Sequence, residues 1–200
     1  MGNTDIFEAM AGNYDNEERA QIARIASDAI REYIENGSDK SAIDFGCGTG
    51  LVGLNLLDEF EHIVFLDSSP NMLEQIKHKL IGADIRNAST VCFDFETGSS
   101  SEIRADYIFM VQVLLHIKDV EHILSRLYEV LNPGGHLLIV DFDKNENVPA
   151  DMVHNGFDQG SLNDLMTKVG FKESNSKTIY SGSKIFMNQD ASLFIMDARK

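Results

Sequence analysis

The sequence has few basic residues, and this scarcity excludes several classes of partner. Its 200 residues include 17 Lys and Arg against 32 Asp and Glu, a formal net charge of −15 at pH 7. A protein that binds nucleic acid needs clustered Lys and Arg to neutralise phosphates, and the sequence has no basic run. Docking on an anionic lipid surface needs the same residues. We therefore expect no nucleic acid and no membrane as partner.

Cysteine, proline and long apolar runs are also scarce. Two cysteines do not make the disulfide framework of a small secreted protein, which favours a reducing compartment. Three prolines leave no Pro-rich linker between domains. The longest apolar run, residues 108–117, is too short to span a membrane, and the first residues lack the pattern of a signal peptide. These features predict a single cytoplasmic globular domain over residues 1–200.

Helix and strand signals alternate along most of the chain. Apolar residues at helical spacing between 22 and 34 predict an opening helix that ends at Asn36-Gly37, where glycine accepts the left-handed conformation. The alternation that follows is typical of right-handed crossovers and of a parallel sheet covered on both faces. The expected strands are 42–45, 62–66, 90–93, 107–113 and 137–140, and the expected helices are 51–60, one from Ser69-Pro70, one after Asp119 and one from Ser161 to Gly170.

The tail of the sequence is rich in β-forming residues. Residues 177–180 are followed by a predicted turn at Ser181-Gly182-Ser183 and by two further stretches, 184–187 and 192–196. These stretches predict an antiparallel pair added to the end of the sheet.

The most informative segment has three alternating glycines between a buried strand and a helix. Gly46, Gly48 and Gly50 allow a tight backbone turn and a close approach by a ligand. The helix that follows presents free N–H groups to electronegative atoms. The pattern is close to the dinucleotide fingerprint G-x-G-x-x-G, but the third glycine comes one residue early. A tight strand-to-helix turn without a ligand is the alternative.

Acidic residues follow the next two expected strands. Asp67 ends the second strand, 17 residues after Gly50, where a carboxylate can accept bonds from both hydroxyls of a ribose. Its alternative role is to cap the next helix. Asp94 follows the third strand, where an acid can accept the exocyclic amine of adenine, and Phe95 offers a backbone N–H and an apolar wall. For Asp94, a simple turn residue is the alternative.

Together these residues resemble the class I S-adenosylmethionine-dependent methyltransferases. The segment 44–50 is similar to the first motif of that family, and Asp67 and Asp94 match its strand-ending acids. Segments 106–116 and 131–135 match its fourth strand, the helix that follows and the entry to the fifth strand. The resemblance implies an α/β fold, a Rossmann-like three-layer sandwich. Its seven-stranded sheet is mostly parallel with an antiparallel last strand, and helices precede it.

The resemblance also implies a division of the chain and a cofactor. Residues 1–37 would form an N-terminal helical lid, 41–142 the cofactor-binding core, and 143–200 a substrate loop, a last helix and a terminal hairpin. The cofactor would be S-adenosylmethionine, with S-adenosylhomocysteine as product. The residues that would bind it are Tyr14, Asp44, Gly46, Cys47, Gly48, Gly50, Asp67, Ser68, Met72, Asp94, Phe95, Val111 and Gln112.

Individual roles follow from the same resemblance. The glycine turn would pass under the methionine part of the cofactor, with Asp44 below it supporting the ammonium group. Tyr14 would reach the cofactor carboxylate. Cys47 is interpreted as a small packing residue and not as a nucleophile.

The expected activity is transfer of the methyl group to a small molecule by in-line displacement. The cofactor carries the activated methyl, so the protein mainly aligns the acceptor, and no metal is expected. If the acceptor must lose a proton, His116 and His154 are the candidate bases, and with Tyr14 they are the candidate acceptor-binding residues. Segment 111–114 lacks the Asn- or Asp-Pro-Pro-aromatic motif of enzymes that methylate nucleic-acid bases. A non-catalytic regulator that binds the cofactor, and an NAD-dependent oxidoreductase, are the alternatives.

Overall fold

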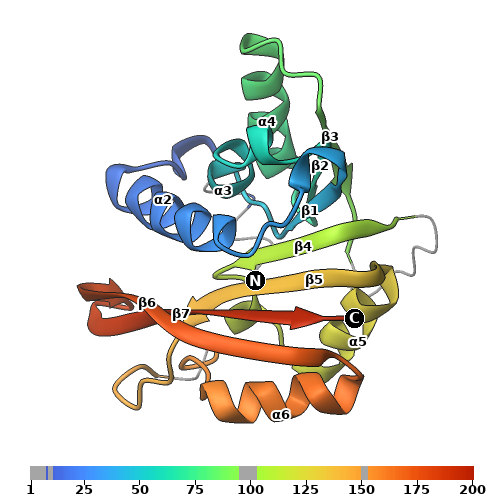
Figure 1. Ribbon diagram of the computed structural model, residues 1–200. Helices are drawn as coiled ribbons and strands as arrows, with labels where there is room; N and C mark the ends of the chain where they lie inside the picture. The colour runs from blue at the N-terminus through green and yellow to red at the C-terminus, as the bar shows by residue number, and fades with distance from the viewer. Residues whose placement is uncertain (1–7, 9–10, 95–102, 150–152) are drawn as a thin grey trace. The chain divides into compact units, whose positions relative to one another are not determined.

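A computed structural model of the chain describes residues 8, 11–94, 103–149 and 153–200 (Figure 1). The chain comprises two compact units, Met1–Ser100 and Ser101–Lys200. Three strands belong to the first unit and four to the second, and together they are the strands of a seven-stranded sheet. The single domain expected over residues 1–200 stays a prediction.

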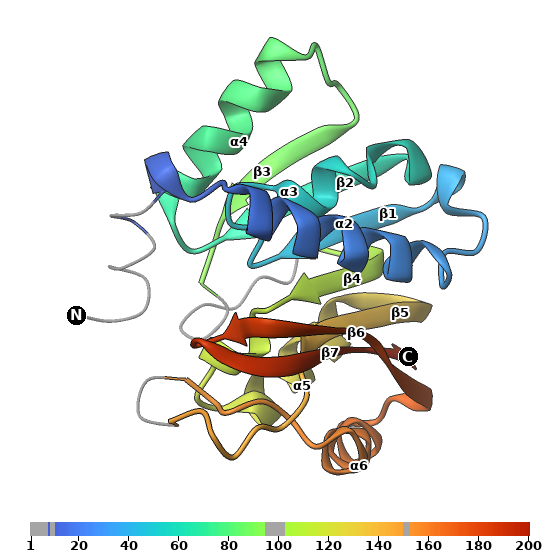
Figure 2. The same cartoon turned by 90° about the vertical axis from the view of Figure 1, so that its left-hand side faces the viewer.

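The first unit is built on three parallel strands in the order β3-β2-β1. Helix α4 packs on β2 and β3, and α2 packs against α3 (Figure 2). The elements of this unit are η1 (Ala11–Asn13), α2 (Glu17–Arg31), η2 (Gly37–Asp39), β1 (Ser41–Phe45), α3 (Leu51–Leu54), η3 (Leu57–Glu59), β2 (His62–Asp67), α4 (Pro70–Gly82) and β3 (Ala88–Cys92).

The two longer helices of this unit begin where the sequence supplies caps. The Asn16 side chain accepts a hydrogen bond of 2.8 Å from the backbone N–H of Arg19 at the start of α2. Ser69 caps α4 in the same way, with Pro70 as its first residue, as predicted. The buried face of α2 includes Ile22 and Ile30, so its apolar periodicity is matched by burial.

The second unit combines parallel and antiparallel pairing. Strands β4 and β5 are parallel, β7 is antiparallel to β5, and β6 lies outside β7 and antiparallel to it. The expected antiparallel strands at the end of the sheet are therefore confirmed. The elements of this unit are β4 (Ala105–Val111), η4 (Leu114–His116), α5 (Val120–Val130), β5 (Leu131–Phe142), α6 (Gln159–Val169), β6 (Lys172–Phe186) and β7 (Gln189–Arg199).

The helix expected over residues 51–60 is wrong in its length. Helix α3 ends at Leu54, and η3 follows after a short break. The carbonyls of this segment are bound by side chains from other elements. Asn55 O accepts from the Arg31 guanidinium, and Leu57 O accepts from Asn87 Nδ2 at 2.9 Å. These tertiary bonds replace the helical bonds that would continue α3.

The predicted hairpin turn at Ser181–Ser183 is also wrong. Strand β6 runs through these residues, with Ser181 paired to Ser192, and the chain reverses at Met187-Asn188 instead. Met187 and Asn188 have φ of 48° and 63°, as a two-residue type I′ turn requires.

Two predicted helix boundaries differ in their capping residues. Asp158 rather than Ser161 caps α6, because its carboxylate accepts from the Ser161 backbone N–H at 2.8 Å. Near the end of α2, Asn36 takes the left-handed conformation with φ 51°. Gly37 is needed for a close approach, since a Cβ there would lie 2.3 Å from Glu59 O.

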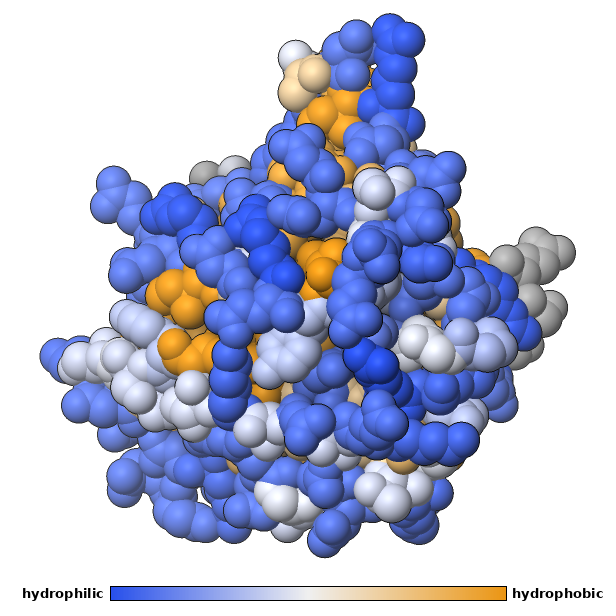
Figure 3. Space-filling model, in the orientation of Figure 1, coloured by the Kyte–Doolittle hydropathy of each residue, from blue (hydrophilic) through white to orange (hydrophobic). Residues whose placement is uncertain are grey.

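The surface agrees with the acidic composition. The face seen in Figure 3 is mainly hydrophilic, with apolar residues in small separate areas. Among the described residues, the exposed large hydrophobic side chains are Ile81 and Met187.

Candidate functional site

The three alternating glycines form a tight turn at the end of β1. Gly46, Gly48 and Gly50 all have positive φ, at 65°, 52° and 82°. Residues other than glycine rarely adopt such backbone angles. A Cβ at Gly50 would lie 3.1 Å from Ile76 Cγ1, so the third glycine lets α3 pack closely on α4. Among the described residues, a Cβ at Gly48 would meet only Tyr14, at 3.8 Å. The turn therefore leaves space at Gly48 that any other residue would fill.

Asp67 lies beside this turn, as the sequence predicts. Its Oδ2 accepts from the backbone N–H of Gly48 at 2.9 Å, and its Oδ1 accepts from the N–H of Ser69 at 2.8 Å. Burial raises the pKa of the Asp67 carboxyl, and these two N–H groups act in the opposite direction. One carboxylate thus links the end of β2 to the glycine turn and to the start of α4.

Asp44 lies within β1, beneath the turn. It is buried, and its Oδ2 accepts from the backbone N–H of Gly53 in α3 at 3.0 Å. Burial raises the pKa of Asp44 to about 7, partly offset by this bond. The carboxyl therefore connects the central strand of the first unit to the helix after the turn.

Cys47 lies in the turn with its side chain buried. Burial raises the pKa of its thiol well above the usual value, and the nearby carboxyls of Asp44 and Asp67 raise it further. The thiolate that a nucleophile requires is therefore disfavoured, which supports the interpretation of Cys47 as a packing residue.

Tyr14 precedes α2 and approaches the turn. Arg19 donates from Nη1 to the Tyr14 carbonyl at 2.5 Å, and its guanidinium lies over the Tyr14 ring, 4.1 Å from the centroid. Burial raises the pKa of the Tyr14 hydroxyl. The first unit thus brings Tyr14, the glycine turn and Asp67 together.

The remaining candidates of the first unit lie around the ends of β2 and β3. Ser68 is exposed, and its carbonyl accepts from Cys92 Sγ at 3.8 Å. Met72 is buried in α4. Asp94 is exposed, two residues beyond the end of β3, and Phe95 lies outside the described residues.

In the second unit, the candidates follow β4. Val111 is the last residue of that strand, and Gln112 follows with φ 54°, its N–H donating to Val140 O at 2.8 Å. A positive φ at a residue other than glycine is uncommon and is often associated with function. The two residues are therefore held at the carboxyl end of β4.

A buried acid that the sequence analysis missed organises the same turn. Asp141 in β5 is fully buried, and it accepts from the Leu115 N–H at 3.2 Å and from the Phe142 N–H at 2.8 Å. Burial raises the pKa of Asp141 to about 7, against the effect of these bonds. The signal was present, since Asp141 comes directly after the apolar run 137–140, just as Asp67 comes after the apolar run 63–66.

His116 and His154 lie on neighbouring segments. The His154 backbone N–H donates to Leu115 O at 2.8 Å, and its Nε2 lies 2.8 Å from Ile117 O. Because a carbonyl only accepts, His154 Nε2 carries the hydrogen in this bond, which leaves Nδ1 as the acceptor of the neutral ring. Burial lowers the pKa of His116, so its ring is neutral at pH 7.

The predicted substrate loop, which includes His154, has a closed stem. Lys144 N donates to Phe157 O at 3.0 Å, Phe157 N to Phe142 O at 2.9 Å, and Asn145 N to Asn155 O at 2.8 Å. Gly156 has φ 92°, and a Cβ there would lie 2.3 Å from Asp143 O. The two ends of the loop are thus held together at the end of β5.

The described residues bear on two other kinds of site, a metal centre and a membrane span. No group of three or more His, Cys, Asp or Glu side chains in that part of the chain is arranged to hold a metal ion. None of its helices is both long and apolar enough to cross a membrane.

Among known proteins, the chain is similar to methyltransferases. Residues 43–137 match the family model described as "Methyltransferase domain". Phosphoethanolamine N-methyltransferase 2 of Caenorhabditis elegans is 31% identical over 130 residues, which is 61% of this chain and 28% of that protein. The chain spans about half or less of the length of several curated relatives that it matches.

Solved structures show the fold. The [4+2]-cyclase SpnF is similar with a TM-score of 0.76 and 18% identity, over 89% of this chain and 81% of that one. Phosphoethanolamine N-methyltransferase 2 of Haemonchus contortus, in complex with S-adenosyl-L-methionine, gives a TM-score of 0.73 at 16% identity, over 97% and 60%. The Rossmann-like fold expected from the sequence is confirmed.

Proposed function

We propose that the chain is a class I S-adenosylmethionine-dependent methyltransferase, the family that it resembles, and that it transfers a methyl group from S-adenosylmethionine to a small-molecule acceptor. The observation that carries this proposal is the contact between Asp67 and the glycine turn. Its two oxygens bind the N–H groups of Gly48 and Ser69, so the carboxylate is fixed where the turn leaves open space at Gly48.

The residues of the first unit fit the cofactor chemically. Asp67 would accept from the ribose hydroxyls with the lone pairs that remain on its oxygens. The side-chain-free turn at Gly48 would let the methionine part lie against the backbone, and Tyr14 would bind its carboxylate. Ser68, Met72 and Asp94 are assigned to the adenosine end by their place after β2 and β3.

The chain's main task in this reaction is alignment. When bound, the cofactor supplies an activated methyl group on a sulfonium, so no further activation of the donor is needed. Val111 and Gln112 would line the cofactor from the end of β4. His116 and His154 are candidates to accept a proton from the acceptor, since the His116 ring is neutral at pH 7 and His154 presents Nδ1 as an acceptor.

The net charge of the chain and the substrates named for its relatives both favour a small acceptor. A net charge of −15 does not suit a nucleic-acid substrate. Relatives of the chain include phosphoethanolamine N-methyltransferases, whose named acceptor is small. A cytoplasmic location stays a prediction from the sequence.

The main alternative is a protein that binds the cofactor without transferring its methyl group. A [4+2]-cyclase shares the fold, so this fold does not by itself fix the reaction. The chain has glycine at 46, 48 and 50 and Asp67, and a decayed site would be expected to lose some of these residues.

The first experiment is titration calorimetry of the full chain with S-adenosylmethionine, S-adenosylhomocysteine and NAD. We expect binding of both adenosyl compounds and none of NAD. Binding of NAD alone would contradict the proposal. Release of S-adenosylhomocysteine with a panel of small amines, alcohols and thiols then separates a transferase from a binding protein, because a binding protein releases none with any acceptor.

A further inference from the structure

We propose that Asp15, Thr49 and Lys79 form a latch that positions Tyr14 at the glycine turn and so sets the affinity for the cofactor. The inference rests on the proposed function and adds a set of contacts that regulates the affinity of the same site. It concerns residues of the first unit only, and none of the three is among the residues assigned to contact the cofactor.

The latch is a closed triangle of hydrogen bonds. Asp15 Oδ1 accepts from Thr49 Oγ1, and Asp15 Oδ2 accepts from Lys79 Nζ at 2.8 Å. Lys79 Nζ also donates to the Thr49 carbonyl at 2.8 Å. Each of the three residues therefore binds the other two, and they come from the segment before α2, the glycine turn and α4.

The latch includes a residue of the glycine turn that lies beside the proposed cofactor-binding residues. Thr49 lies between Gly48 and Gly50, and it is 2% exposed. Asp15 and Lys79 are more exposed, with 41% and 32% of their side-chain surface accessible. The triangle thus ties a buried residue of the turn to two groups at the surface.

Tyr14 is held from both sides by these contacts. Asp15 follows it directly and is fixed to Thr49 and Lys79, while Arg19 binds its carbonyl and covers its ring. Its ring atom Cε1 lies 3.8 Å from the place where Gly48 would carry a Cβ. The latch and Arg19 thus restrain the segment before α2 from two directions, so loss of the latch would leave the Tyr14 ring less well placed.

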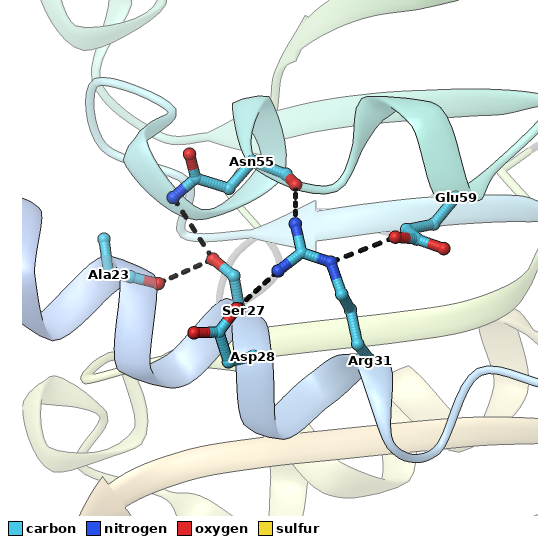
Figure 4. A network of polar contacts seen from close by, with 6 residues as sticks. All are labelled: Ala23, Ser27, Asp28, Arg31, Asn55 and Glu59. Carbon is cyan, nitrogen blue, oxygen red and sulfur yellow. Dashed lines mark hydrogen bonds and ion pairs between the residues drawn. The ribbon is translucent and has the colours of Figure 1, made fainter.

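The other end of α2 provides a matched control. Arg31 donates to Glu59 Oε1 at 3.0 Å, to Asp28 and to the Asn55 carbonyl (Figure 4). Ser27 Oγ accepts from Asn55 Nδ2 at 3.3 Å in the same network. These contacts also fix α2 to the following segments, but they do not include Tyr14 or the glycine turn.

The test measures the Kd for S-adenosylmethionine by calorimetry, with Tm as a measure of folding. We expect Asp15→Asn and Lys79→Met each to raise the Kd about five- to tenfold. Lys79→Arg keeps a cation and should stay close to the unaltered protein. Arg31→Met should lower Tm while leaving the Kd within about twofold, because it loosens α2 away from the site.

A double-mutant cycle separates positioning from a general structural effect. If the latch acts through Tyr14, Asp15→Asn should raise the Kd in the unaltered protein but not in a Tyr14→Ala background. An equal rise in both backgrounds, or an unchanged Kd in Asp15→Asn, overturns the latch alone. Absence of binding by the unaltered protein overturns the proposed function, and the latch with it.

Discussion

At the scale of single residues, Asp67 is the residue on which the proposed cofactor site depends most. Its oxygens bind N–H groups from the glycine turn and from the start of α4, so the carboxylate is oriented before any ligand arrives. A group held in this way loses little conformational freedom on binding. The free energy that Asp67 contributes to binding should therefore be close to the full free energy of its hydrogen bonds to the ligand.

Replacing Asp67 with Ala should strongly weaken the binding of S-adenosylmethionine. Charge-assisted hydrogen bonds contribute about 1.5–3 kcal/mol, so the Kd should rise by roughly 10- to 150-fold. Calorimetry measures the change, and Asp84→Ala serves as the control because Asp84 is exposed and pairs with Arg86. An unchanged Kd in Asp67→Ala would remove the ribose assignment.

The buried carboxyls predict how stability depends on pH. Burial raises the pKa values of Asp44 and Asp141 to about 7. Between about pH 4 and pH 7 the folded protein keeps protons that the unfolded chain has released, so the free energy of unfolding falls as pH rises through this range. His116 has the opposite sign, because its lowered pKa costs stability as pH falls below about 6.5.

This dependence is tested by urea denaturation at pH 5, 6, 7 and 8. We expect the unaltered protein to be less stable at pH 8 than at pH 5, and Asp141→Asn to show a flatter dependence whatever its absolute stability. Asp84→Asn should keep the slope of the unaltered protein. Parallel slopes for Asp141→Asn and the unaltered protein would contradict the prediction.

The candidate residues differ in how far the sequence predicts them. The glycine turn and Asp67 were predicted because their signals are local: a buried strand, then residues whose type is unusual for a strand end. The bonds of Asp15 join residues 34 and 64 positions apart, and polar contacts of this kind have no periodic signal. Such contacts emerge only from the folded structure.

At the scale of elements, helix α3 shows how packing limits a short helix. Gly53 lies in its middle, and a Cβ there would lie 2.5 Å from Phe65 Cε1 and 2.6 Å from Asp44 Oδ2. Alanine is the better helix former, but at this position it would push apart a strand and a helix that are already in contact.

Gly53→Ala should therefore destabilise the protein by about 1–3 kcal/mol in urea denaturation. The matched control is Gly82→Ala at the end of α4, where a Cβ would meet no atom of another described element within 4 Å. That change should be neutral or stabilising by up to about 1 kcal/mol. Equal stability of the two variants would show that the close packing around Gly53 is absent.

The elements that the sequence predicted least well were those fixed by tertiary contacts. Strands and capped helices follow from local patterns, and Ser69 and Asp119 cap α4 and α5 as expected. Helix α3 stops early where the carbonyls of Asn55 and Leu57, just beyond its end, accept from side chains of other elements. The hairpin turn lies at Met187-Asn188, where both residues have positive φ, although Ser-Gly-Ser is the stronger turn sequence.

At the scale of the whole molecule, the net charge of −15 sets the response to salt. Like charges repel in the compact state more than in the unfolded chain, and salt screens this repulsion. Tm should therefore rise between about 20 and 300 mM NaCl, where the Debye length falls from about 20 Å to about 6 Å. KCl should give the same rise, whereas a rise with only one of the two salts would indicate a specific ion instead of screening.

The closed stem at the end of β5 has a consequence for how such a chain can diversify. Its backbone bonds join Lys144 to Phe157 and Asn145 to Asn155, so the two ends of the loop are held together next to the strand. Segments of other length or composition can be exchanged there while the ladder of β5 and β7 is preserved. Under the proposed function, in which this segment is the substrate loop, the preference for one acceptor over another could change during evolution with little loss of folding stability.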